Sequence, residues 1–116
     1  MTDISIVFVT VGKEEEASAM GRTLVEEGFI ACANIVPGIR SIYRWKGKIC
    51  DEPELLVIMK TRTSLVPVLK DRVRELHSYE VPEIVSFPIE QGLQEYLDWV
   101  VQNTREYVPT YTPTES

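Results

Sequence analysis

The stretch FIACANIVPGIRSIYRWKGKICDEPELLVIMKT, residues 29–61, decides the fold. Phe29 to Trp45 and Lys48 to Thr61 are rich in apolar and β-branched side chains, so each segment predicts a strand. Lys46 and Gly47 supply a two-residue turn between them, with glycine where a positive φ costs least. Because strands usually have about five or six residues, the stretch predicts an unusually long β-hairpin.

Prolines inside the hairpin predict irregular pairing at two places. Pro37 followed by Gly38 fits a bulge or bend better than a regular ladder. Pro53 marks a second irregularity in the returning strand.

The turn also predicts where the two cysteines lie. Counted back from the turn, Cys50 faces Tyr43 and Cys32 faces Thr61. This arrangement separates the two thiols by roughly 35 Å along the ribbon at the usual strand rise. Since a disulfide tolerates a Cα separation of at most about 7 Å, we expect both thiols to be free. Free thiols favour a reducing cytoplasm.

Regular elements flank the hairpin on both sides. Ile4 to Val11 is almost uniformly apolar and predicts a central strand. An amphipathic helix follows the acidic residues 14–16, and Gly28 closes it. After the hairpin, Ser64 is the expected N-cap of a second amphipathic helix, with Pro67 in its first turn.

The end of the chain completes the predicted fold. Glu83 to Ile89 predicts a fourth strand, and a third amphipathic helix follows Gly92. The order β-α-β-β-α-β with an added C-terminal helix predicts an α+β, ferredoxin-like sandwich with its helices on one face of the sheet. We assign residues 1–104 to this single domain and 105–116, rich in Thr, Pro and Tyr, to a loosely ordered tail.

The hairpin is longer than its own sheet can pair. The excess carries apolar and aromatic side chains, namely Ile42, Tyr43, Trp45 and Ile49. An exposed ribbon of this kind promotes aggregation in a monomer, so we expect closed self-association through the hairpin. Three copies close the projecting hairpins into a ring, which predicts a trimer.

Charge and hydropathy exclude several partners. The net charge of -6 and the absence of a dense Lys/Arg cluster argue against nucleic-acid binding. No apolar run approaches the roughly 20 residues that span a bilayer, and no basic segment precedes the first strand. We therefore expect a cytoplasmic protein that binds neither nucleic acid nor membrane.

Five segments together resemble one protein family. They read ACANIVPGI at 31–39, SIYRWKGKI at 41–49, KT at 60–61, HSYEVPEI at 77–84 and YLDW at 96–99. In this order they resemble the CutA family, the divalent-cation tolerance proteins, over nearly the whole chain. The resemblance implies a ferredoxin-like fold assembled as a tight trimer whose long hairpins pair across subunits. It also implies kinship in architecture with the PII signalling proteins, which hold ligands in clefts between subunits.

The resemblance links the chain to tolerance of copper and other divalent cations, and mammalian relatives to the anchoring of acetylcholinesterase. It attaches no reaction to the fold. The copper site proposed for bacterial members uses a cysteine in the first strand and a histidine pair before a loop proline. Here Val9, Leu76-His77 and Ser78 stand at these positions. We therefore expect copper, where it binds, to bind weakly.

Two groups remain candidate metal ligands. His77 is the single histidine, and its alternative role is to cap the C-terminus of the second helix. Cys50 precedes Glu52 and Glu54, which share its face of the strand, and the alternative is a solvated strand end. Cys32 lies among small apolar residues and is expected to be a packed thiol.

A ligand cleft and a function complete the expectations. The resemblance places Lys60, Tyr79, Glu83 and Trp99 along the cleft between subunits. No Ser-His-Asp set, phosphate loop or Cys/His metal spacing is present, so we expect no enzyme and no required cofactor. The leading hypothesis is a trimeric cytoplasmic binding or scaffold protein associated with divalent-cation tolerance. The alternative is a PII-like sensor that binds a small anionic metabolite in the cleft and signals to a partner.

Overall fold

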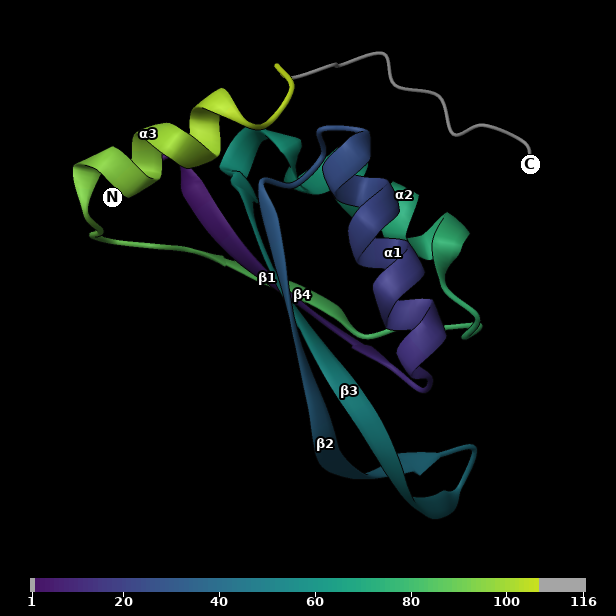
Figure 1. Ribbon diagram of the computed structural model, residues 1–116. Helices are drawn as coiled ribbons and strands as arrows, with labels where there is room; N and C mark the ends of the chain where they lie inside the picture. Colours follow the sequence, from purple (N-terminus) through teal and green to yellow (C-terminus); the bar gives the residue numbers. More distant parts are fainter. Residues whose placement is uncertain (1, 107–116) are drawn as a thin grey trace.

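A four-stranded antiparallel sheet in the order β2-β3-β1-β4 organises the chain, and the hairpin projects beyond it (Figure 1). This computed structural model describes residues 2–106. The elements follow the expected order: β1 (Ile4–Val11), α1 (Glu14–Glu26), β2 (Cys32–Trp45), β3 (Lys48–Arg62), a 3-10 helix (Thr63–Leu65), α2 (Val66–Leu76), β4 (Ile84–Pro88) and α3 (Gln94–Gln102). The α+β, ferredoxin-like prediction is thus confirmed.

The hairpin has the predicted turn and one of the two predicted irregularities. Lys46 and Gly47 both have positive φ, 50° and 79°, as a tight two-residue hairpin turn requires. The register shifts between Val36 and Ile39, which confirms the bulge at Pro37-Gly38. The irregularity expected at Pro53 is wrong, because Pro53 pairs in register with Arg40.

This register shift changes the predicted pairing partner of one cysteine. Cys50 pairs with Tyr43 as predicted, but Cys32 pairs with Lys60 and not with Thr61. The bulge adds one residue to β2, so every pair beyond it moves by one position. The expectation of free thiols is confirmed, since Cys32 and Cys50 form no disulfide.

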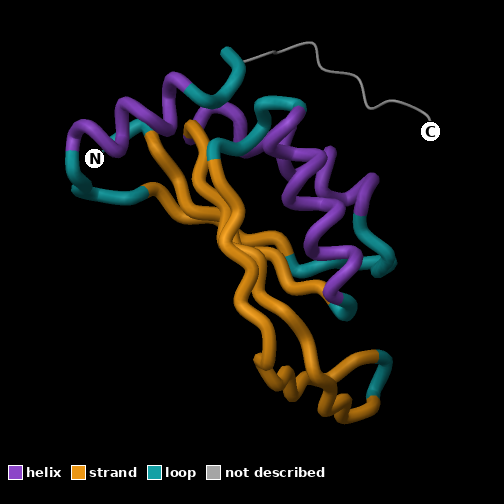
Figure 2. Tube along the Cα trace, in the orientation of Figure 1, coloured by secondary structure: helices purple, strands orange, loops and turns teal. Residues whose placement is uncertain are grey.

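The hairpin overshoots the sheet. The partners of β1 on β3 are Leu55 to Arg62, so Lys48 to Glu54 pair with β2 alone. The tube in Figure 2 shows these two strands continuing past the rest of the sheet to the turn.

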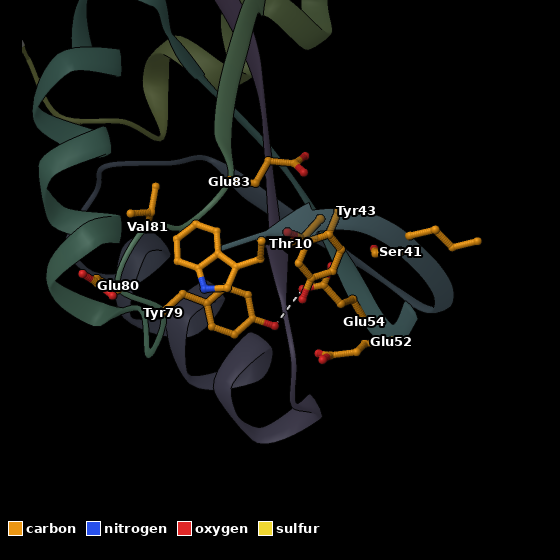
Figure 3. A pocket seen from close by; sticks show the side chains of 11 residues that line it. Thr10, Ser41, Tyr43, Glu52, Glu54, Tyr79, Glu80, Val81 and Glu83 are labelled. Carbon is orange, nitrogen blue, oxygen red and sulfur yellow. Dashed lines mark hydrogen bonds between the residues drawn. The ribbon is translucent and has the colours of Figure 1, made fainter. Parts of the chain in front are cut away.

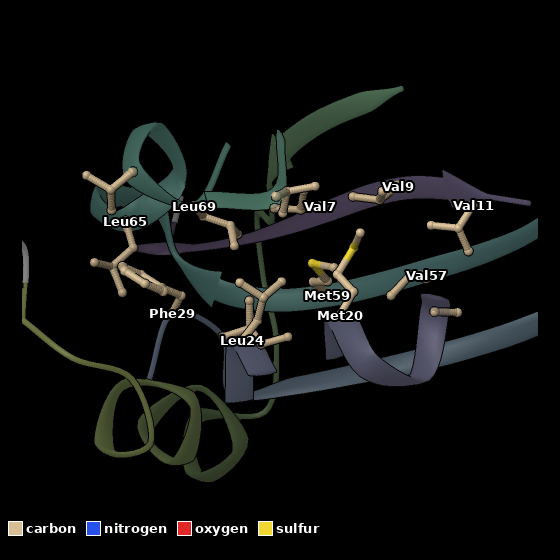
Figure 4. Packing of buried hydrophobic residues seen from close by; sticks show 14 of the residues in the cluster. Val7, Val9, Val11, Met20, Leu24, Phe29, Val57, Met59, Leu65 and Leu69 are labelled. Carbon is tan, nitrogen blue, oxygen red and sulfur yellow. The ribbon is translucent and has the colours of Figure 1, made fainter. Parts of the chain in front are cut away.

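One face of the sheet carries the main core beneath α1 and α2 (Figure 4). Alternate β1 residues Val7, Val9 and Val11 point to this face and are almost fully buried. They pack with α1 and α2 side chains such as Leu24 and Leu69. Burial of these side chains is the main source of stability, at roughly 25 cal/mol per Å².

The third helix departs from the expected arrangement. Leu97 and Val100 of α3 pack with Ile4 in a second, smaller cluster. Because side chains alternate along a strand, Ile4 points away from the face that α1 and α2 cover. The expectation that the helices share one face is therefore confirmed for α1 and α2 and is wrong for α3.

Helix ends follow the sequence signals in part. Gly28, with φ 75°, ends α1 as predicted, and its carbonyl accepts the backbone N–H of Arg105 at 2.8 Å. Ser64 is not the N-cap of α2, because the chain first makes a 3-10 turn and α2 starts at Val66 with no side-chain cap. Of the predicted tail 105–116, residues 107–116 lie outside the described residues.

Replacing Leu69 by Ala tests the main core. Leu69 is fully buried, so Leu69→Ala should lower the free energy of unfolding by about 2 to 5 kcal/mol. Urea unfolding at a fixed subunit concentration measures this change. The exposed neighbour gives the control Lys70→Ala, which should change stability by less than about 0.5 kcal/mol. Equal effects of the two substitutions would contradict the assignment of Leu69 to the core.

Candidate functional site

A cavity of about 560 Å³ lies between the hairpin and the loop that follows α2 (Figure 3). Its wall on one side comes from β2 and β3, and on the other from residues 79–83. Small-molecule sites commonly have volumes of about 300 to 1,000 Å³, so the cavity has the size of a ligand site.

Three aromatic rings line the cavity. Tyr43 and Trp45 are two residues apart on β2, so the strand periodicity turns both toward it, and Tyr79 comes from the loop. Tyr43 and Trp45 keep 38% and 41% of their surface exposed, which leaves their rings accessible. The rings therefore offer flat apolar surfaces to a ligand.

Four carboxylates accompany the rings. Glu52 and Glu54 come from alternate positions of β3, and Glu80 and Glu83 come from the loop. No Lys or Arg side chain lines the cavity in the part of the chain that the structure describes. The cavity is consequently acidic as well as aromatic.

Tyr79 and Glu54 form the inner contact of the site. The Tyr79 hydroxyl donates a hydrogen bond of 2.7 Å to Glu54 Oε2, and Glu54 is only 7% exposed. Partial burial, and then the hydrogen bond to the Glu54 carboxylate, hold the pKa of Tyr79 well above its usual value. Gly12 makes room for this hydroxyl, because a Cβ there would lie 2.9 Å from it.

The pKa of Tyr43 reflects the same acidic environment. Loss of hydration raises the pKa of its hydroxyl, and the negative charge of Glu52 raises it further. Both tyrosines of the cavity are therefore held in the neutral form by their surroundings.

His77 is the C-cap of α2, as one of the two sequence hypotheses states. Its Nε2–H donates to the Thr10 carbonyl at 2.7 Å, and its Nδ1 accepts the Tyr79 backbone N–H at 3.0 Å. This pair of bonds occupies both ring nitrogens, and the Glu16 carboxylate lies 3.5 Å from Nδ1. Neither nitrogen is left with a lone pair for a metal, and the ring instead fixes the loop that carries Tyr79.

The other residues considered as metal ligands are packed in the core or lie apart from one another. Val9 is fully buried in the main core and Leu76 packs against it. Cys50 is half-buried beside the hydroxyl of Tyr43. Within residues 2–106, no three His, Cys, Asp or Glu side chains are arranged to hold a metal ion.

A single chain brings together two of the four expected cleft residues. Tyr79 and Glu83 line the cavity, whereas Lys60 and Trp99 do not. Lys60 Nζ instead donates to Asn34 Oδ1, and Trp99 stacks on Tyr96 with ring centroids 5.6 Å apart.

The hairpin side of the cavity was not predicted from the sequence. There, Tyr43 and Trp45 were assigned to self-association, and Glu52 and Glu54 to a metal group or a solvated strand end. The signal was present in the register, because Ser41 faces Glu52 and Tyr43 faces Cys50. This pairing puts the aromatic side chains and the carboxylates on one face of the ribbon.

Comparison with known proteins shows the family. The profile described as "CutA1 divalent ion tolerance protein" matches residues 5–103. The chain belongs to the CutA1 divalent ion tolerance family. This confirms the resemblance in the sequence.

The relatives agree with this CutA1 assignment. The Divalent-cation tolerance protein CutA of Thermus thermophilus is 52% identical over 99 residues, which are 85% of this chain and 96% of that protein. Human Protein CutA is 46% identical over 94% of this chain, but the chain spans only 61% of the human protein. The crystal structure of CutA1 from Oryza sativa has a TM-score of 0.87 at 41% identity and covers 90% of this chain and 96% of its own.

The matches also bear on the alternative function and on location. They give no support to the PII-like sensor. Relatives in rice and Arabidopsis are named chloroplastic. Among residues 2–106, no helix is both long and apolar enough to cross a membrane.

Replacing Tyr79 by Phe tests the inner contact through pH. Because the pKa of Tyr79 is raised in the folded state, its stabilising effect is complete below about pH 10 and is lost as the pH rises above that value. Tyr79→Phe should cost about 1 to 3 kcal/mol near neutral pH, since it leaves the Glu54 carboxylate without this donor. The difference from the parent should narrow above about pH 10. Denaturant unfolding across this pH range measures both effects.

The matched control is Tyr43→Phe, which removes a hydroxyl whose hydrogen-bond partner is the Cys50 thiol and not a carboxylate. It should cost less than Tyr79→Phe near neutral pH. A Tyr79→Phe variant as stable as the parent throughout would show that the contact with Glu54 contributes nothing.

Proposed function

We propose that this CutA1-family chain acts as a non-enzymatic, cytoplasmic homotrimer, a binding or scaffold protein that contributes to divalent-cation tolerance. Membership of the family and the names of its relatives support the link to divalent cations. The two free thiols support the cytoplasm. The proposal of a non-enzymatic role is supported by the hydrogen bonds of the single histidine, which leave it no free nitrogen to act as a base.

The exposed hairpin is the observation that carries the proposal. Ile42 and Ile49 are 64% and 63% exposed, and the strand segment that bears Ile49 pairs with β2 alone. At the other edge of the sheet, Val85 and Phe87 of β4 are 50% and 42% exposed. Two open edges on opposite sides of one sheet suit a head-to-tail contact, and such contacts close into a ring when the rotation permits.

A trimer also provides for the expected ligand cleft. Tyr79 and Glu83 line the cavity of one chain, while Lys60 and Trp99 lie elsewhere on it. We propose that a neighbouring subunit supplies these two side chains. This cleft therefore depends on assembly.

Metal contact in this proposal is weak or indirect. The candidate ligand His77 has both ring nitrogens hydrogen-bonded, which leaves Cys50 as the more accessible soft ligand. A tight copper site needs two or three soft or imidazole ligands in one place. Weak copper binding that depends on Cys50 is the expected behaviour, and His77 would contribute only by giving up one of these hydrogen bonds.

Charge placed on the hairpin tests the trimer. Ile49→Asp should dissociate the assembly and leave the subunit fold intact, because Ile49 is 63% exposed in the single chain. Sedimentation velocity and circular dichroism measure the two properties. Val25→Asp is the control, since Val25 is 43% exposed on α1 and lies near Ala33 and Ile35 at the start of β2, away from the projecting end of the hairpin. A parent that sediments as a monomer at micromolar concentration would overturn the proposal.

Copper titration tests the metal contact. Calorimetry of copper into the apo protein should show binding weaker than micromolar, and Cys50→Ser should weaken it further. His77→Gln is compared after circular dichroism has confirmed its fold, because the ring also fixes the loop through Thr10 and Tyr79. Submicromolar binding of one ion per subunit that survives both substitutions would show that other ligands hold the metal.

A further inference from the structure

We propose that the acidic, aromatic cavity binds an extended organic cation, an aliphatic diamine or polyamine. This inference goes beyond the proposed function, since it requires neither a metal nor the two side chains assigned to a neighbouring subunit. It follows from the charge, the spacing and the aromatic walls of the cavity.

The charge of the lining selects a cation. Carboxylates from β3 and from the loop border the cavity, and no described Lys or Arg lines it. Glu52 and Glu83 form no ion pair or hydrogen bond within residues 2–106, so their charges are available to a ligand. The Lys60 that we assign to a neighbouring subunit adds one positive charge against four carboxylates, so the cleft keeps a net negative charge that repels an anionic metabolite.

The spacing of the carboxylates excludes a compact ion. Figure 3 shows Glu80 beside Val81 on one side of the cavity, Glu52 on the opposite side and Glu83 apart from both. No three acidic side chains of the described chain converge on one point as a metal ion requires. A ligand that satisfies them must therefore carry positive charges several bonds apart.

The aromatic walls suit the methylene chain between such charges. Tyr43, Trp45 and Tyr79 present apolar ring surfaces that alkyl groups cover favourably, and their faces attract ammonium groups. The volume of about 560 Å³ admits a flexible chain of this kind.

Beside the cavity, a lysine of the chain itself already makes the contacts that we assign to an alkylammonium ligand. The ammonium of Lys46 lies 5.7 Å from the centroid of the Trp45 ring and 3.9 Å from Glu80 Oε2. Lys46 belongs to the exposed hairpin turn and does not line the cavity. A tethered alkylammonium thus makes the ring and carboxylate contacts that we assign to the ligand.

Calorimetry with spermidine on the assembled protein tests the inference. Spermidine should bind with a micromolar to millimolar dissociation constant. This constant should rise as salt is added, because the contacts are ionic. The neutral diol of the same chain length should bind at least about tenfold more weakly. Citrate, as the anionic probe, should give no binding.

Variants locate the site. Glu52→Gln and Glu83→Gln remove charge with little change in shape from two exposed side chains, and together they should weaken spermidine binding at least about tenfold. The control is Glu90→Gln, the same change at an exposed glutamate that does not line the cavity. Lys46→Met removes the tethered ammonium and should leave binding equal or tighter.

The results separate this inference from the proposed function. Sedimentation of the same samples reports assembly independently of binding. An intact trimer that binds no spermidine, binds the diol as well as spermidine, or binds citrate instead would overturn the cation site and leave the trimer standing. A monomer that binds spermidine through Glu52 and Glu83 would support the site and contradict the trimer.

Discussion

The pairing of β2 with β3 is the constraint on which the rest of the structure depends. Backbone hydrogen bonds fix the ribbon from the turn at Lys46-Gly47 to the start of β2, and the bulge after Val36 adds one residue to one strand only. Because side chains alternate, this register decides which residues of the hairpin face together. A slip by one position would turn the aromatic side chains and the carboxylates of the ribbon to opposite faces.

The local parts of the fold could be predicted from the sequence because their causes are local. A glycine at a positive φ marks the turn at Gly47 and the end of α1 at Gly28, and the proline of Pro37-Gly38 marks the bulge. Proline alone was a poorer signal, since Pro53 fits a ribbon segment that has no third strand to require its missing N–H.

The features that the sequence did not reveal depend on distant residues. The buried Glu54 accepts a hydrogen bond from Tyr79, 25 positions later, and that approach requires the small residue at Gly12. The orientation of the His77 ring depends likewise on the Thr10 carbonyl at the end of β1. No periodicity or spacing links these residues, so only the folded chain brings them together.

The contact between Arg105 and the end of α1 fixes where the chain leaves the domain. Its backbone N–H donates to Gly28, its side chain donates to the Glu27 carbonyl, and its guanidinium lies 4.4 Å from the centre of the Phe29 ring. In Figure 1 this region lies at the end of the molecule remote from the hairpin turn. A fluorescent protein or an affinity tag fused directly after Arg105 would therefore start at the end of the molecule remote from the hairpin turn, which suits labelled forms of the protein to measurements of ligand binding and of assembly.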